Sequence, residues 1–334
     1  MITCFELTSR TRLTRMRSAP SPIDEHLALL ASAHHDAGVP IPPLLDVTGA
    51  DPDAVDAVRA LPTITFARVA SPLPPRESGP ADLAVPAASV AALSAAVARN
   101  PTASLVVVQL IRATARLPIH DALAMESLAY SMLQAGTEYR SWLARRGTPE
   151  RLPDPAPRVR ITGEPGRTIL CLDRPDHANA LDTQARHELV DALTALRHSD
   201  DEIVLRGAGP HFCAGGDLDE FSSPSDVTAT HHLRLRQGVA SSVARVRSRL
   251  RAEVHGGVIG AGVELSAFAQ HVSASPDARF RLPEVRMGLL PGSGGSVSLP
   301  RRIGPNRALI LMLTGAVLDA GTALTWGLVD EVRA

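Results

Sequence analysis

The second half of the chain alternates short strands with helices, and this alternation restricts the possible folds more than any other feature. RVRITGE and RTILCLD form a predicted hairpin with GEPG as its turn, and EIVLRG (202–207) is a predicted strand. Helices are expected over 183–199 and 231–250. This order is typical of parallel βα units, whose sites usually lie at the carboxyl ends of the strands. We therefore expect an α/β fold over residues 158–334.

The first half has a different texture. Two Pro-rich stretches, SPLPPRESGPAD (71–82) and GTPERLPDPAPR (147–158), have the composition of linkers. Between them the sequence predicts only helices, over 85–100, 102–117, 120–136 and 137–146. Before them it predicts a helix over 23–38 and a possible strand over 63–70.

These patterns divide the chain into three predicted regions. Residues 1–70 form an N-terminal extension without an assignable role, 80–150 form an all-helical segment, and 158–334 form the α/β core. The 334 residues, 45% of them hydrophobic, are enough for one large domain or two ordinary ones.

Composition narrows the class of function. A net charge of −1 and a pI near 6.9 give no support for nucleic-acid binding. No apolar run approaches the ~18 residues that a membrane span requires. Cys4, Cys171 and Cys213 lack the spacing of metal ligands, and the N-terminus lacks the apolar segment of a secretory signal. We therefore expect a cytosolic protein with reduced thiols and no metal, nucleic-acid or membrane partner.

Two glycine-rich turns are the first candidates for a functional site. In HFCAGGDLDEF (211–221) a predicted strand leads into Ala214-Gly215-Gly216, and GGVIGAGVELSAF (256–268) repeats the order of strand, turn and helix. The N–H of Ala261 would lie at a helix N-terminus, where donors lack partners and the dipole favours negative charge. Two such N–H groups aimed at one carbonyl oxygen would form an oxyanion hole, which stabilises by about 3 kcal/mol per donor.

Two carboxylates follow these turns among apolar neighbours. Glu264 lies three residues beyond Ala261 on the same helical face, and Glu284 follows the strand ARFRL and Pro283. A buried carboxylate is costly unless it is paired, protonated or used. Two carboxyls beside an activated carbonyl compound suit acid–base chemistry at its α and β carbons. The alternative is a pair of structural carboxylates that cap helices or bridge arginines.

At this point the residues carry a family resemblance. DRPDHANAL (173–181), HFCAGGDLDEF, GAGVEL and RFRLPEVRMGLLPGSGGSVSLPRRIG resemble the crotonase (enoyl-CoA hydratase/isomerase) superfamily, in family order, over about 158–333. The resemblance implies a ββα spiral core that binds acyl-CoA thioesters. It implies that Gly216 and Ala261 supply the oxyanion hole, and that Glu264 and Glu284 are the catalytic pair of the hydratase branch.

The implied reaction is addition of water to a 2-enoyl-CoA, without a metal or redox cofactor. The resemblance also implies a homotrimer or hexamer, and a CoA channel lined by Ala178, Ala180, Asp217 and Leu218. Which glutamate is the acid stays open, because the pair would titrate as one coupled system. The alternatives are double-bond isomerisation, retro-Claisen cleavage, and a non-catalytic CoA-ester-binding protein whose residues 1–70 bind a partner.

The order of the segments departs from the family. Family members continue after GLVDEV with helices that cover the acyl pocket and build the trimer, whereas this sequence ends at Ala334. The segment over about 85–146 resembles that tail, with its NP-A element, LxxE helix and closing aromatic-plus-Arg helix. We predict a circular permutation in which 147–158 joins the old termini. An unrelated helical domain is the alternative.

One predicted strand, RAEVHG, is unusually polar. Its period of two places Arg251, Glu253 and His255 on one face. A ladder of salt bridges is the simpler interpretation, and a polar substrate pocket or a subunit contact is the alternative.

Overall fold

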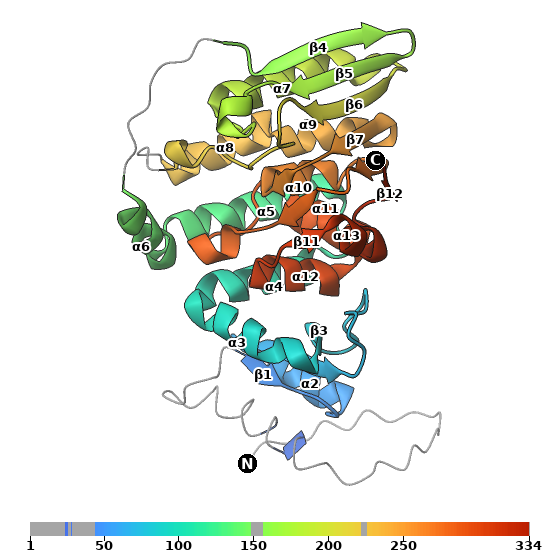
Figure 1. Ribbon diagram of the computed structural model, residues 1–334. Helices are drawn as coiled ribbons and strands as arrows, with labels where there is room; N and C mark the ends of the chain where they lie inside the picture. The colour runs from blue at the N-terminus through green and yellow to red at the C-terminus, as the bar shows by residue number, and fades with distance from the viewer. Residues whose placement is uncertain (1–23, 26–27, 29–43, 148–155, 222–225, 334) are drawn as a thin grey trace, which may run out of the picture.

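The computed structural model describes residues 24–25, 28, 44–147, 156–221 and 226–333 (Figure 1). The predicted helix over 23–38 lies outside these residues apart from three positions. Among the described residues no single helix is long and apolar enough to cross a membrane. Among these residues only the helical pair Ala87–Arg99 and Pro101–Thr114 has the required length and composition together, and it is bent by 108°.

A six-stranded sheet forms one end of the molecule. Its order is β12-β9-β7-β6-β5-β4. The strands are β4 Val159–Glu164, β5 Arg167–Leu172, β6 Glu202–Gly207, β7 Leu250–Val254, β9 His271–Ala274 and β12 Glu331–Val332. Only the β4–β5 hairpin is antiparallel. The predicted hairpin and the parallel βα units are therefore confirmed.

A second, three-stranded sheet sets the position of both candidate glutamates. Its strands β8 (Gly257–Ile259), β10 (Arg279–Arg281) and β11 (Leu318–Asp319) have the order β11-β10-β8. β8 and β10 run parallel with Ile259 opposite Arg281. Helix α10 (Ala261–Ser266) follows β8, and the short helix η6 (Glu284–Met287) follows β10. Neighbouring parallel strands thus deliver two residues that are 20 positions apart to one edge.

Further helices of this half surround these sheets and one another. They are α7 Thr183–Ala195, α8 Val227–Gln237, α9 Val239–Val246, α11 Gly295–Ile303, α12 Pro305–Thr314 and α13 Ala320–Trp326. The single helix predicted over 231–250 is wrong, because Gly238 is extended (φ −71°, ψ 127°) and separates α8 from α9. A Cβ at this position would lie 2.3 Å from the carbonyl oxygen of Arg234.

The N-terminal half combines a sheet with several helices. β1 (Leu44–Asp46), β2 (Ile64–Val69) and β3 (Leu83–Pro86) form a parallel sheet in that order, beside α2 (Pro52–Arg59). The helices that follow are α3 Val90–Arg99, α4 Pro101–Thr114, α5 Ile119–Gln134 and α6 Thr137–Arg146. An all-helical segment from residue 80 was therefore a wrong prediction. The four residues of β3 are all buried and pair with β2, so one sheet spans the predicted boundary at residue 70.

The Pro-rich stretch 71–82 packs on the C-terminal half and is not a loose linker. Arg307 Nε donates to the carbonyl of Pro74 (2.9 Å), and Asn306 Nδ2 donates to that of Pro75 (2.8 Å). Asn306 and Arg307 both belong to α12 and are buried. These buried hydrogen bonds hold the stretch between β2 and β3 of the N-terminal sheet against α12.

Asp82 ties the same stretch to helix α4. Its buried carboxylate accepts from both Nε and Nη2 of Arg112, and from N and Oγ1 of Thr65 (2.8 Å each). Arg59 Nε lies 3.3 Å from Oδ1 of this carboxylate. The charge of Asp82 is therefore compensated within the fold.

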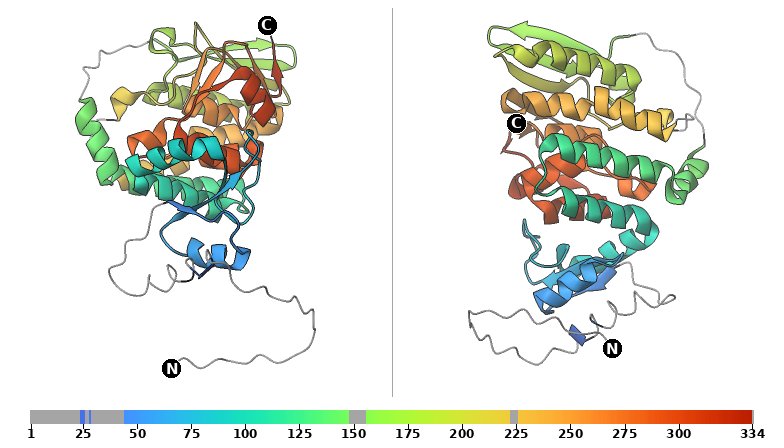
Figure 2. Two further views of the ribbon diagram at one scale, coloured as in Figure 1. Left: turned by 60° about the horizontal axis from the view of Figure 1, so that its bottom comes forward. Right: turned by 180° about the vertical axis from the view of Figure 1, so that it is seen from behind.

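Both halves share one hydrophobic core. A single buried cluster runs from Ile64 and Leu83 through Val107 to Leu299 and Val329. In both views of Figure 2, α4 and α5 lie alongside the helices of the C-terminal half. The helical segment is consequently part of the same structural unit as the α/β core.

The polar face of β7 forms a ladder of salt bridges, which confirms the simpler interpretation. Glu253 Oε2 lies 2.5 Å from Arg206 Nε, and Arg251 Nη1 lies 3.5 Å from Glu202. A ring nitrogen of His255 lies 2.9 Å from the carbonyl oxygen of Gly209.

Candidate active site

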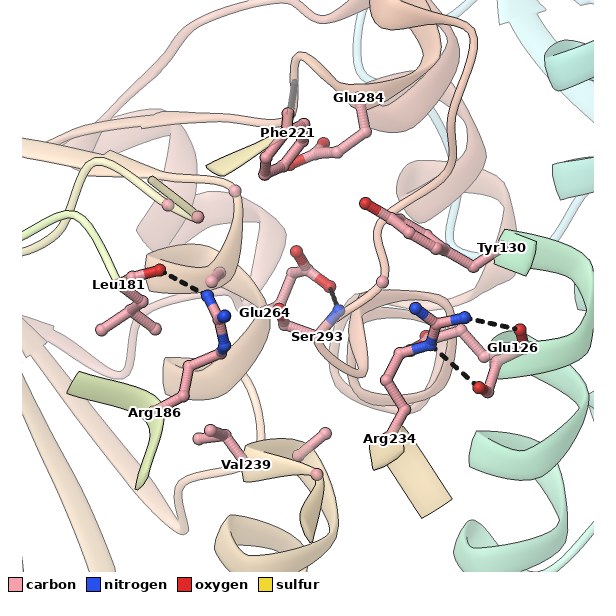
Figure 3. Close-up of a pocket in the computed structure, with 18 of the residues that line it drawn as sticks. Glu126, Tyr130, Leu181, Arg186, Phe221, Arg234, Val239, Glu264, Glu284 and Ser293 are labelled. Carbon is pink, nitrogen blue, oxygen red and sulfur yellow. Dashed lines mark hydrogen bonds between the residues drawn. The ribbon is translucent and has the colours of Figure 1, made fainter. Parts of the chain in front are cut away.

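A cavity of about 1040 Å³ lies between the α/β core and helices α5, α6 and α8 (Figure 3). Residues 214–216, 259–261, 283–284 and 292–293 form much of one wall. The opposite wall comes from the helices that precede the α/β core. The volume is at the upper end of the range for small-molecule and cofactor sites.

The two glycine-rich turns lie side by side at this cavity. Ile259 N donates to the Cys213 carbonyl (2.8 Å), and a Cβ on Gly215 would lie only 3.6 Å from Ala261 N. Gly216 and Ala261 both line the cavity. Neither of their N–H groups donates a hydrogen bond within the part of the chain that the structure describes. The predicted oxyanion-hole donors are thus brought together and left available.

Glu264 is buried at the start of α10, 2% exposed. Its Oε2 accepts from the N–H groups of Ser293 (2.6 Å) and Gly295 (2.9 Å). Burial raises the pKa of Glu264 well above its usual value, and the charges of Glu284 and Glu126 add to this effect. The two backbone N–H groups act in the opposite direction.

Glu284 stands beside it with fewer partners. It is 8% exposed, and its Oε2 has no hydrogen-bond partner among the described residues. Burial raises the pKa of Glu284 to about 8, although its own N–H and Arg281 lower it. A Cβ on Gly260 would lie 2.6 Å from Glu284 Oε1. Because Gly260 also has φ +51°, only glycine fits there without strain.

A third carboxylate, Glu126 of α5, was not among the predicted site residues. It is 3% exposed, and Oε1 accepts from Gly294 N (2.8 Å). Oε2 accepts from Ser296 Oγ (2.6 Å) and Ser296 N (3.1 Å). Burial raises its pKa to about 7 against these hydrogen bonds. Glu126 and Glu264 therefore bind alternate N–H groups where α11 begins, and the lone acid in the apolar run LAMESLAY was the available sequence signal.

Aromatic side chains form much of the helical wall. Tyr130 points into the cavity (Figure 3), and a Cβ on Gly292 would lie 2.4 Å from its ring. Tyr139 stacks on Trp142 with ring centroids 6.0 Å apart, and its hydroxyl donates to the Phe221 carbonyl (3.0 Å). Both tyrosines of the chain lie here, although only 3% of its residues are aromatic. Sequence patterns gave no signal for this grouping.

The predicted CoA-channel residues divide into two groups. Leu218 lines the cavity, whereas Ala178, Ala180 and Asp217 are not on its wall. The Asp217 carboxylate lies 2.7 Å from Arg174 Nη1 and accepts from Asp219 N, so its visible role is structural.

Ala178 supports the oxyanion turn through its backbone. It adopts a left-handed conformation (φ 50°), and its carbonyl accepts from Ala214 N (2.9 Å). Contact of Ala178, Ala180 and Asp217 with CoA stays a prediction. In the described part of the chain, no group of three or more His, Cys, Asp or Glu side chains is placed to hold a metal ion.

Comparison with known proteins gives the family of the C-terminal half. The family described as enoyl-CoA hydratase/isomerase matches residues 166–334. Probable enoyl-CoA hydratase echA8 of Mycobacterium tuberculosis is 36% identical over 167 residues, 49% of this chain and 64% of that protein. Enoyl-CoA isomerase/hydratase fer4 of Mycosarcoma maydis is 32% identical over 174 residues, with 49% and 64% covered. The chain thus spans less than two thirds of these relatives.

Solved structures are similar to about half of the chain. Enoyl-CoA hydratase of Mycobacterium smegmatis superposes with a TM-score of 0.50 at 31% identity, over 54% of this chain and 71% of that one. DspI of Pseudomonas aeruginosa gives a TM-score of 0.50 at 28% identity, with 54% and 70% covered.

Proposed function

Because the chain belongs to the enoyl-CoA hydratase/isomerase family, we propose that it adds water across the double bond of a 2-enoyl-CoA. One observation carries this proposal: two buried glutamates lie beside two available backbone N–H groups in one cavity. The reaction needs these four groups and no redox cofactor.

The thioester oxygen is held by the N–H groups of Gly216 and Ala261. They stabilise the negative charge that develops on this oxygen when Cβ is attacked. An ionised glutamate takes a proton from water while the water oxygen bonds to Cβ, and a protonated glutamate gives its proton to Cα. The product gains H at Cα and OH at Cβ, and the two glutamates exchange protonation states.

Hydrogen bonding supports an assignment of the glutamate that starts as the base. Glu264 Oε2 accepts two backbone N–H groups, and such bonds favour the ionised form. Glu284 Oε2 accepts none among the described residues, and a pKa of about 8 keeps this group protonated at neutral pH. A protonated Glu284 no longer raises the pKa of Glu264 by its charge. We therefore assign Glu264 as the base and Glu284 as the acid.

Hydration of a panel of 2-enoyl-CoAs tests the proposal. Glu264→Gln and Glu284→Gln should each lower kcat by a factor of about 10²–10⁴, because general acid–base catalysis contributes that much. Both variants should still bind the unreactive butyryl-CoA. Glu253→Gln, which alters a carboxylate of the β7 salt-bridge ladder, is the matched control and should keep full activity. Wild-type protein that binds butyryl-CoA but hydrates nothing would favour isomerase, lyase or purely binding functions.

We also propose that the chain is a circular permutant of its family. Arg307 bridges the two regions that the permutation would separate, since it donates to the carbonyls of both Pro74 and Trp326 (2.9 and 3.0 Å). This shared contact supports the permutation, because it joins the segment leading into α3 to the end of α13. A chain reordered as 158–333, a flexible Gly/Ser linker and 44–147 should fold and hydrate the same substrates. A reordered chain that unfolds cooperatively but binds no thioester would contradict the permutation.

An exposed apolar face bears on the assembly of the protein. We propose a homotrimer or hexamer in the cytosol. The exposed face of α5 carries Met125, Leu128 and Met132, which are 40–54% exposed and share one helical face. Light scattering measures the assembly, and a monomer at micromolar concentration would contradict it.

A further inference from the structure

Arg234 lies in α8 on the cavity wall, and helix α5 holds its guanidinium from one side. Nε donates to Ser127 Oγ (2.9 Å), and Nη2 donates to Ser131 Oγ and to the Ser127 carbonyl (3.3 Å). Nη1 makes only a long bond to Gln134 Oε1 (3.4 Å). The guanidinium carbon lies 4.8 Å from the centre of the Tyr130 ring. The orientation of the cation is therefore fixed, and all of its acceptors are neutral.

The charge of Arg234 is not compensated by an ion pair. A guanidinium has five N–H donors, and the four acceptors leave one N–H of Nη1 without a partner among the described residues. Two other cavity arginines are paired: Arg146 with Asp219 (2.6 Å) and Arg186 with Glu220 (2.8 Å). Arg234 forms no salt bridge in the described part of the chain.

Partial burial makes the unpaired charge of Arg234 costly. Desolvation lowers the pKa of Arg234, and the carboxyl that counteracts it is Glu126. Both carboxylate oxygens of Glu126, however, already accept hydrogen bonds from backbone N–H groups at the N-terminus of α11. Arg281 and Arg286 also form no ion pair among the described residues. The charge of Arg281, however, lowers the pKa of Glu284, and Arg286 is exposed to solvent. A partly buried cation of this kind is stabilised by an anion that enters the cavity.

The position of Arg234 indicates which part of a ligand it meets. Figure 3 shows Arg234 and Tyr130 on one side of Glu264, with Leu181 and Arg186 on the other. Leu181 is joined to the oxyanion turn, since its N–H donates to the Gly215 carbonyl (2.8 Å). With the thioester carbonyl at that turn and CoA on the Leu181 and Leu218 side, the acyl chain extends toward Arg234.

We propose that Arg234 binds a carboxylate at the far end of the acyl chain, so that the substrate is a CoA thioester of an unsaturated dicarboxylic acid. This inference rests on the proposed function. Nη1 supplies the free donor, and an entering carboxylate displaces the long contact to Gln134. Ser127, Ser131 and Tyr130 hold the guanidinium in place.

Paired saturated thioesters of equal chain length isolate this contact. Succinyl-, glutaryl- and adipoyl-CoA are compared with butyryl-, pentanoyl- and hexanoyl-CoA by calorimetry. Wild-type protein should bind at least one diacid thioester about 10- to 100-fold more tightly than its neutral partner, as a charge-assisted hydrogen bond contributes that much. Arg234→Gln should abolish this ratio while still binding the neutral thioesters, which also reports that it folds.

Two further variants test whether the affinity ratio depends on this position and on the guanidinium group. Arg236→Gln, on an exposed position of the same helix, should keep the wild-type ratio. Arg234→Lys should keep part of it, because it retains the charge but loses the fork of donors.

Two outcomes would overturn the inference. Equal wild-type affinity within all three pairs would refute a carboxylate site. A uniform loss in Arg234→Gln for both members of a pair, together with weaker binding of adenosine 3′,5′-bisphosphate, would place a CoA phosphate at Arg234 instead. In either case, hydration of neutral 2-enoyl-CoAs by the same preparation would leave the proposed function standing. Failure to bind any thioester would remove both.

Discussion

Glu126 offers the sharpest test of how the helical half supports the candidate active site. It accepts hydrogen bonds from Gly294 and Ser296, while Glu264 accepts from the two N–H groups next to them, those of Ser293 and Gly295. The backbone of residues 293–296 thus binds both carboxylates. A change at Glu126 should therefore shift this backbone and, with it, the carboxylate of Glu264.

Glu126→Gln changes one acceptor oxygen into an NH₂ donor. If the amide oxygen keeps the two bonds from Ser296, the new NH₂ faces the N–H of Gly294, and one buried hydrogen bond is lost. This loss should cost about 1–3 kcal/mol of unfolding free energy. A displaced turn would also shift Glu264, and misplacement of about 1 Å can cost up to ~10²-fold in rate. We expect kcat for enoyl-CoA hydration to fall about 10- to 100-fold.

Glu138→Gln is the matched control. Glu138 accepts from the N–H groups of Thr102 and Ala103 (2.8 and 2.9 Å) at the N-terminus of α4, away from the cavity wall. Because these bonds are only partly shielded from water, it should lose less stability than Glu126→Gln in urea denaturation and should keep its kcat. Equal losses of kcat in both variants, or full activity in Glu126→Gln, would refute the claim that Glu126 positions Glu264.

Three other predictions test separate parts of the structure. The folded protein holds a proton on Glu284 up to about pH 8, whereas an unfolded glutamate releases it near 4.5, so stability should decrease as pH rises through that interval. Urea denaturation of Glu284→Gln should show a flatter pH dependence, and an unchanged slope would contradict the raised pKa. Asp82→Ala should cost about 3–5 kcal/mol, measured by urea denaturation, because it removes a fully buried carboxylate and leaves the partly buried Arg112 without its charge partner; a loss under 1 kcal/mol would contradict this. Gly260→Ala should abolish hydration by displacing Glu284, and a fully active variant would show that this carboxylate can move.

Local order in the sequence was enough to predict the central part of the site. Gly216 and Ala261 lie in glycine-rich turns, and Glu264 and Glu284 follow predicted strands. The sequence did not predict the pairing of β8 with β10 that brings the two glutamates to one cavity. The short strand β3 was missed, because three apolar residues before Pro86 resemble the approach to a helix when the partner strand is unknown.

Residues contributed by distant helices could not be predicted in the same way. Glu126 and Tyr130 reach the cavity only because α5 packs on α11, and Arg234 because α8 packs on α5. These positions depend on contacts across more than 100 residues, such as Arg234 with Ser127. A helical period shows which face of a helix is buried but not what lies opposite it.

The contacts of 74–76 with α12 also have a consequence for synthesis on the ribosome. The partners of the N-terminal sheet, Asn306 and Arg307, emerge more than 230 residues after Pro74 and Pro75. Helices α4 and α5 are therefore made well before α11 and α12, with which they share a core. Nascent chains that stop before residue 295 should expose apolar surface and recruit chaperones, whereas chains that include α11 and α12 should not.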